Sequence, residues 1–161
     1  MKATSTLKIR PCNDSTELAD ARQKELNIPR AVAISLGLSA VQAAKQGYYL
    51  YRNQTRVEWG NLVQAACAGK VSIPPEAALP TPPQSKFTET RIQIANETTL
   101  GASRRLLQAR LKPVALNFAN GITPCGGFLS GARAQEEVLC RSSALYQTLV
   151  GDPMYLSLIN I

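Results

Sequence analysis

The spacing of apolar residues predicts several helices along the chain. Between Arg30 and Gln46 the sequence is rich in alanine and leucine, which favours a helix, although Gly37 interrupts it and the apolar residues alternate in places. Gly47 follows as an expected C-terminal cap. Residues 1–15 are mostly polar and are expected to be irregular. Further helices are expected over about 16–26, over 59–68 with Gly69 as the stop, and from Thr98 or Thr99 to about Arg110.

Two stretches before the last third of the chain have the pattern of β-strands. Residues 48–57 predict a small hairpin with three tyrosines on its first arm. Tyrosine rings are able to stack on nucleic-acid bases, but packing is their commoner use. Ile92 and Ile94 alternate with Arg91 and Gln93, which predicts a second strand.

A proline-rich connector divides the chain. It is expected to be extended and without regular structure, and it carries Pro74, Pro75, Pro80, Pro82 and Pro83. We therefore expect an N-terminal tail and helical extension over residues 1–86 and the first part of a catalytic core over 87–161.

The last third of the chain reads as strand, glycine-rich loop and helix. Val114–Leu116 is an apolar run typical of a strand buried on both faces of a parallel sheet. Asn120, Pro124 and four glycines follow, and a helix is expected from about Ala134, because apolar residues as far as Leu149 fall on one stripe. The strand near Ile92, the following helix and this strand would form a right-handed crossover, with the loop at the carboxyl edge of a sheet. That edge is where α/β proteins bind nucleotides.

Two adjacent carboxylates, Glu136 and Glu137, fall in the first turn of the predicted helix. Acidic residues are common there because they offset the positive end of the helix dipole, so capping alone accounts for an arbitrary pair. Successive helical residues also diverge by roughly 100°. One carboxylate is therefore able to face a cavity while the other lies along its wall.

Charge and composition narrow the classes of function. The net charge of +7 favours a polyanionic partner such as a nucleic acid, but a merely basic surface is an equally good explanation. The absence of histidine excludes histidine-dependent triads and histidine-ligated metal sites. No segment is long and apolar enough to span a membrane, and the N-terminus has no signal-like apolar stretch, so a cytoplasmic location, or a nuclear one in a eukaryote, is expected.

The four cysteines show no CxxC spacing, so reduced thiols are expected. Cys125 and Cys140 flank the glycine-rich loop and are able to meet in space. An unpaired, small hydrophobic side chain is nevertheless the commoner role for each.

The residues around the loop resemble the microbial-type poly(ADP-ribose) glycohydrolases. Pro124-Cys125-Gly126-Gly127 and, after seven residues, Gln135-Glu136-Glu137 are similar to that family's triple glycine followed by Gln-Glu-Glu. The ordered matches extend to the stretches 47–50, 89–100, 117–120, 131–134 and 141–146. The resemblance implies a macrodomain-like, three-layer α/β/α fold with a mixed sheet and a helical N-terminal extension.

The resemblance also implies an activity, the hydrolysis of ribose–ribose O-glycosidic bonds in poly(ADP-ribose) or on ADP-ribosylated protein, with release of ADP-ribose. By family position, Glu137 would be the general acid and then the base, and Glu136 would hold the ribose hydroxyls. Gln135 and Asn120 would orient the same ribose, while Gly126 and Gly127 would let the diphosphate pass close to the main chain. No cofactor or metal is implied.

Two departures from the family pattern leave alternatives open. Cys125 replaces the first glycine of the triplet, and the family's second glycine-rich loop and adenine-binding residues lie beyond Ile161, so the core is expected to be truncated. The alternatives are an impaired ADP-ribose-binding module or inactive fragment, and, less favoured, a basic nucleic-acid-binding protein. An open sheet edge and the apolar ending 154–159 would favour self-association. The oligomeric state stays open.

Overall fold

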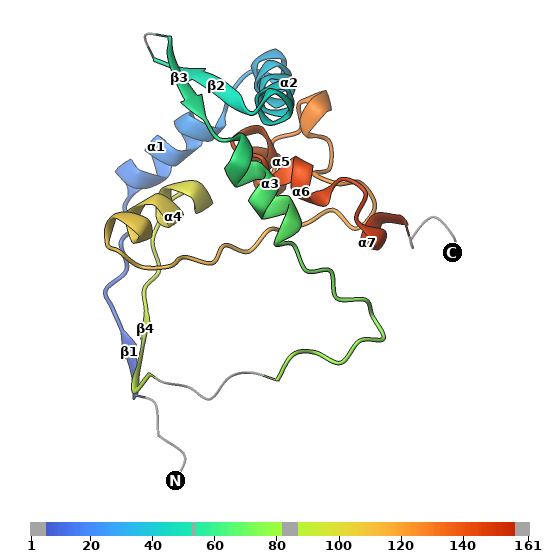
Figure 1. The fold of residues 1–161 in the computed structure, drawn as a ribbon. Helices are drawn as coiled ribbons and strands as arrows, with labels where there is room; N and C mark the ends of the chain where they lie inside the picture. Colours follow the sequence, from blue (N-terminus) through green and yellow to red (C-terminus); the bar gives the residue numbers. More distant parts are fainter. Residues whose placement is uncertain (1–5, 53, 82–86, 157–161) are drawn as a thin grey trace.

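The computed structural model describes residues 6–52, 54–81 and 87–156 as a mixed α/β chain (Figure 1). Helices outnumber strands, and the strands form two small sheets of two strands each. In chain order the elements are β1 Thr6–Ile9, α1 Thr16–Leu26, α2 Arg30–Gln46, β2 Tyr48–Tyr51, β3 Thr55–Glu58, α3 Gly60–Ala68, β4 Glu89–Ile92, α4 Thr99–Gln108, η1 Phe128–Ser130, α5 Gln135–Arg141, α6 Leu145–Leu149 and α7 Pro153–Leu156.

The predicted helices before the proline-rich connector, and the helix after it, are confirmed. The Ser15 hydroxyl caps α1 by accepting from the amide of Leu18, and Thr98 caps α4 in the same way at Gly101. Gly47 ends α2 with a φ of 80°, a conformation that glycine adopts without steric cost. Despite Gly37, α2 continues without a break.

The predicted hairpin is confirmed, since β2 and β3 pair antiparallel with Tyr48 opposite Glu58 and Tyr51 opposite Thr55. Of the two strands in the second sheet, only β4 was predicted. β4 lies near the expected position, but its parallel partner is β1, which falls within the tail expected to be irregular. The alternating pattern of the short stretch Thr6–Ile9 was too brief to reveal a strand that forms by pairing with a segment eighty residues away.

The predicted strand at Val114–Leu116 is wrong in this structure. The residues are extended, but they join no sheet, and 98% of Val114 is exposed. The crossover and the sheet edge predicted beneath the loop are therefore absent from the described residues. An apolar run becomes a central strand only when neighbouring strands pair with it on both sides, and β4 pairs with β1 instead.

The small core lies where α2, η1, α5 and α6 meet, away from the β1–β4 pair (Figure 1). Cys125, Phe128 and Cys140 are fully buried there, and Tyr146 packs on Phe128 with ring centroids 5.0 Å apart. Gly37 lets α2 pack closely against Phe128, because a Cβ at that position would lie 3.2 Å from the Phe128 ring. The same glycine that weakened the helix prediction thus allows α2 to approach η1.

The predicted helix from about Ala134 to Leu149 is interrupted at residues 142–144 and forms α5 and α6. Ser143 stabilises the break, because its hydroxyl donates to the carbonyl of Leu139 and accepts from the amide of Leu145.

None of the described helices is long and apolar enough to span a membrane. Residues 82–86 of the predicted connector and residues 157–159 of the apolar ending lie outside the described part of the chain. The rest of the connector, as far as residue 81, contains no helix or strand, as predicted.

Candidate active site

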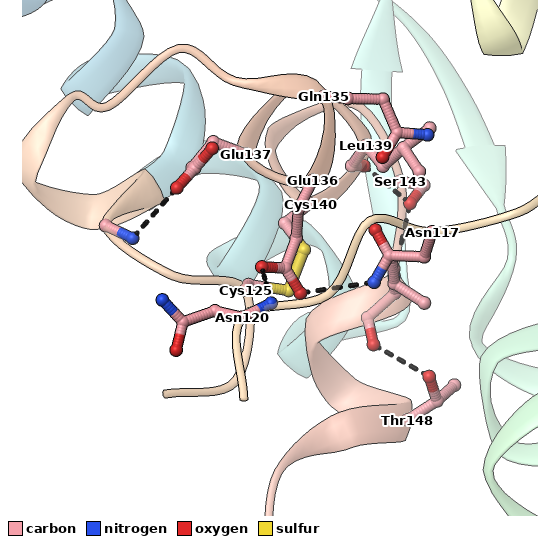
Figure 2. The surroundings of a disulfide bond; sticks show 12 residues. Asn117, Asn120, Cys125, Gln135, Glu136, Glu137, Leu139, Cys140, Ser143 and Thr148 are labelled. Carbon is pink, nitrogen blue, oxygen red and sulfur yellow. Dashed lines mark hydrogen bonds between the residues drawn. A yellow bond between two sulfur atoms is a disulfide. The ribbon is translucent and has the colours of Figure 1, made fainter. Parts of the chain in front are cut away.

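A disulfide ties the glycine loop, residues 120–131, to helix α5. Cys125 bonds to Cys140, and both side chains are fully buried (Figure 2). The prediction of unpaired thiols at these two positions is therefore wrong. Cys125 adopts a φ of 61° and Gly126 one of 52°, so the cysteine takes the left-handed backbone conformation that glycine favours. That conformation turns its side chain towards α5, where Cys140 lies on the inner face of the helix.

Glu136 is held in place from the loop. Its two carboxylate oxygens accept hydrogen bonds from the Asn117 side-chain amide at 3.1 Å and from the backbone amide of Asn120 at 2.8 Å (Figure 2). The residue is only 3% exposed. A buried carboxylate without partners would be costly, and these two donors fix the orientation of Glu136.

Glu137 is buried against the glycine pair. It is 8% exposed, and its Oε1 accepts a hydrogen bond from the backbone amide of Gly127 at 3.2 Å (Figure 2). A Cβ built on Gly126 would lie 2.4 Å from the same oxygen, so only glycine fits at that position. The second oxygen, Oε2, is buried and has no hydrogen-bond partner among the described residues. One carboxylate oxygen thus positions the side chain, and the other has no partner among the described residues.

Asn120 and Gln135 have structural partners of their own. The Asn120 side-chain oxygen accepts from the amides of Ile122 and Thr123, both at 2.8 Å, which closes the turn into the loop. The Gln135 amide group bonds to the main chain of Leu116 and Phe118 at 2.8 and 3.0 Å. Gln135 therefore fixes the extended segment that leads to Asn117, and the predicted contacts of both residues with ribose stay predictions.

Arginines anchor the far end of the loop. Arg30 of α2 donates to the carbonyl of Ser130 at 2.8 Å, and Arg133 donates to the carbonyl of Ile28 at 2.9 Å. Arg141 of α5 is buried and donates to the carbonyl of Ala132 at 3.0 Å. Burial lowers the pKa of Arg141, although the nearby charge of Glu137 opposes that shift. A buried cation therefore lies close to the carboxylate of Glu137.

The glycine loop borders a cavity of about 320 Å³. Its wall includes Pro124, Gly126, Gly127 and Tyr146. A larger cavity, of about 430 Å³, lies on the face of α5 that carries Gln135 and Val138, and Glu25 and Glu97 also line it. We place the candidate site at the smaller cavity because Gly126 and Gly127, which line it, lie against the Glu137 carboxylate.

The structure brings together Asn120, Gly126, Gly127, Gln135, Glu136 and Glu137, the six predicted site residues, around the start of α5. Asn117, which donates to Glu136, was not among the predicted site residues. Its signal was its position as the first polar residue after the apolar run. Among the described residues, no three of the side chains able to hold a metal form a cluster.

The chain is similar to solved structures of one bacterial enzyme. Poly(ADP-ribose) glycohydrolase from Thermomonospora curvata is 36% identical and has a TM-score of 0.67, and the match covers 79% of this chain and 48% of that one. The same enzyme bound to the inhibitor ADP-HPD is also 36% identical, with a TM-score of 0.67 and coverage of 80% and 47%. This chain thus spans about half the length of those structures. A comparison with curated proteins finds no match.

The family model described as microbial-type PARG, catalytic domain, matches residues 38–158. That range holds the glycine loop, both glutamates and the disulfide, and it makes up most of the chain. The chain belongs to the microbial-type poly(ADP-ribose) glycohydrolase family.

Proposed function

We propose that this chain supplies the glutamate-bearing part of a glycohydrolase site that cleaves ribose–ribose O-glycosidic bonds and releases ADP-ribose. The observation that carries the proposal is the buried carboxylate of Glu137, which has one oxygen bound to Gly127 and the other without a partner among the described residues. Family membership and the inhibitor complex of the Thermomonospora enzyme support the substrate class. The substrate would be poly(ADP-ribose) or an ADP-ribosylated protein.

Glu137 is proposed to act first as the acid and then as the base. Cleavage passes through an oxocarbenium-like state, so the leaving ribose oxygen must gain a proton as its bond to the anomeric carbon breaks. Protonated Glu137 gives that proton through Oε2. Its carboxylate then takes a proton from the water whose oxygen bonds to the anomeric carbon, which restores the acid.

Glu136 is proposed to hold the ribose hydroxyls while Asn117 and Asn120 hold Glu136. Because both of its oxygens already accept bonds from the loop, any shift of the loop would move the ribose with it. Gly126 and Gly127 would let the diphosphate pass close to the main chain, and Gln135 and Asn120 would orient the ribose.

The finer description of the fold is also a proposal. We infer that residues 87–156 belong to a macrodomain-like, three-layer α/β/α core with a mixed sheet. The mixed α/β content of the chain and its similarity to the solved bacterial enzyme support the inference. The division at residue 86 and a cytoplasmic location stay predictions. The Cys125–Cys140 disulfide argues against the second of these, because structural disulfides are rare in the cytosol.

The test of the proposed function is release of ADP-ribose from labelled polymer, with binding of ADP-ribose measured by calorimetry. We expect Glu137→Gln to lower hydrolysis by roughly 10²–10⁴-fold, the range of general acid–base catalysis, and to retain affinity for ADP-ribose. Glu76→Gln, at an exposed glutamate of the connector, is the matched control and should behave like the wild type. Retained turnover in Glu137→Gln would remove Glu137 from the role.

A second candidate function, binding of ADP-ribose without hydrolysis, is favoured by one observation. The chain matches only 48% of the length of the solved enzyme, so residues of the other half of that enzyme have no counterpart in the match. Binding of ADP-ribose by a wild-type chain that releases none from polymer would support this candidate. Absence of binding, together with salt-dependent binding of an oligonucleotide, would instead support the nucleic-acid alternative.

A further inference from the structure

A second concave surface, the hairpin groove, lies between α2, the β2–β3 hairpin and the end of α5. Its volume is about 580 Å³, and its wall includes Gln42, Tyr49, Tyr51, Trp59, Ser142 and Ser143. Tyr49 and Tyr51 are two residues apart on one strand, so both side chains point to the same face of the hairpin. The tyrosines noted in the sequence therefore present rings to a cavity instead of filling the core.

The aromatic side chains of the groove are packed together at one end and exposed to solvent at the other. Tyr49 packs edge-on against Trp59 at a centroid distance of 5.2 Å, and the Trp59 indole donates to the carbonyl of Ala43 at 3.0 Å. Tyr51, in contrast, is 54% exposed, and the guanidinium of Arg52 lies 5.5 Å from its ring centroid. An exposed ring beside a cation suits a flat base attached to a phosphate.

The charge of the groove favours an anionic occupant. Among the described residues that line it, none is acidic, and Arg141 is basic. The cavity of about 430 Å³ beside Gln135 differs, because Glu25 and Glu97 contribute to its wall together with Arg133 and Arg141. A chain of phosphates would therefore meet less repulsion at the hairpin groove.

The groove ends beside the helix that carries the two glutamates. Ser142 and Ser143 follow α5 directly, and at 1.5 Å per residue the distance along the helix from Glu137 to Ser142 is about 8 Å. A polymer with one unit at Glu137 would thus have its neighbouring unit within reach of the groove wall at Ser142.

We propose that the hairpin groove binds an adenine of poly(ADP-ribose) from a unit next to the one held at the glutamates. The inference rests on the proposed function for the identity of the polymer. Each unit of that polymer carries an adenine and a diphosphate, which match the exposed Tyr51 ring and the basic surroundings at Arg52. A nucleic acid offers similar groups, but the groove's proximity to Glu137 favours the polymer that the glutamates would cleave.

The test measures fluorescence anisotropy with labelled poly(ADP-ribose) chains of defined length, in a Glu137→Gln background that prevents hydrolysis. Tyr51→Leu keeps an apolar side chain but removes the stacking surface, and it is expected to weaken polymer binding about tenfold, within the range for loss of one stacked base. Tyr51→Phe keeps the ring and should restore the affinity. Tyr48→Leu, on the opposite face of the same strand, is the matched control and should bind like the parent.

Monomeric ADP-ribose separates this inference from the proposed function. Its affinity should be the same for Tyr51→Leu and the parent, since it would occupy the glutamate site. If the monomer fails to bind while polymer binding still depends on Tyr51, the proposed function is wrong but adenine binding in the hairpin groove is supported. Equal affinity for polymer in Tyr51→Leu and the parent would contradict adenine binding in the groove. An equal, Tyr51-dependent affinity for oligoadenylate RNA overturns poly(ADP-ribose) as its occupant.

Discussion

Two regions of this chain differ in how completely their side chains are packed. In the site region, residues 117–149, buried carboxylates, a disulfide and the Phe128 ring hold one another in place. In the strand region, residues 6–9, 87–94 and 111–116, apolar side chains such as Ile9, Ile94 and Val114 are 80%, 70% and 98% exposed. Both regions carry apolar sequence, yet only the first contains buried apolar side chains.

The difference follows from the range of the contacts. The bonds that fix Glu136 and Glu137 join residues that are ten to nineteen positions apart. A sheet instead needs partners from distant parts of the chain, and the described residues supply β4 with only one, β1. The bonds to the two glutamates thus form within one loop and the next helix, whereas a central strand depends on the rest of its sheet.

The largest expected effect distinguishes two phenylalanines by their contribution to stability. Phe128, at 1% exposure, lies in the site region, and Phe118, at 68%, lies where the exposed apolar segment enters it. Phe128→Ala should lower the free energy of unfolding by about 3–5 kcal/mol because it empties the core, whereas Phe118→Ala should change it by less than about 0.5 kcal/mol. Denaturant unfolding followed by circular dichroism measures both. Equal losses would mean that Phe118 is buried in solution.

The next largest effect is expected from the disulfide. Cys125→Ala with Cys140→Ala removes a cross-link that closes a loop of 15 residues, which is worth about 3 kcal/mol in the chain-entropy account. Cys12→Ala, at an exposed free cysteine, should leave stability unchanged. Thermal unfolding with and without a dithiol reductant gives the measurement. A wild-type midpoint that does not respond to reductant would contradict a stabilising bond.

A smaller effect separates backbone strain from crowding at the site. Gly126 and Gly47 both have positive φ, so alanine at either should cost about 1–2 kcal/mol. Only Gly126→Ala places a Cβ against Glu137, since the atom nearest to a Cβ at Gly47 is the Cα of Gly60, at 3.4 Å. We therefore expect Gly126→Ala to lose ADP-ribose binding in calorimetry as well, and Gly47→Ala, which does not line the cavity beside the glycine pair, to retain it. Loss of binding in both variants would attribute the effect to strain alone.

Much of the site region was predictable from sequence because its signals are local. The spacing from Gly126 to Glu137 placed the loop beside the start of a helix, and Gly47 correctly marked the end of α2. The family resemblance suggests the proposed roles of the glutamates, which periodicity alone leaves open between capping and chemistry.

The remaining features depended on contacts that a sequence pattern does not contain. The pairing of Thr6–Ile9 with Glu89–Ile92 joins the two parts of the chain, and nothing in either short stretch specified the other. The disulfide required Cys125 to adopt a positive φ, which is uncommon for a side chain with a Cβ. The apolar run at Val114 has the pattern of a buried strand, but its burial would require neighbouring strands that the described residues do not provide.

The smallest expected effect is a pH dependence that links the connector to the end of the site region. The Asp152 carboxylate accepts from Lys70 at 2.8 Å and from the Ser72 hydroxyl at 2.5 Å, and these bonds lower its pKa to about 2. Because the folded-state pKa is below the unfolded value of about 3.9, the stabilisation is complete above that value and disappears as the pH falls towards 2. Asp152→Asn should therefore unfold more easily than the wild type at pH 6, and the difference should shrink between pH 4 and pH 2 in urea titrations. Lys70→Ala, which removes the largest cause of the shift, should reproduce most of this trend, whereas a difference that stays constant with pH would show that the carboxylate charge does not hold the connector.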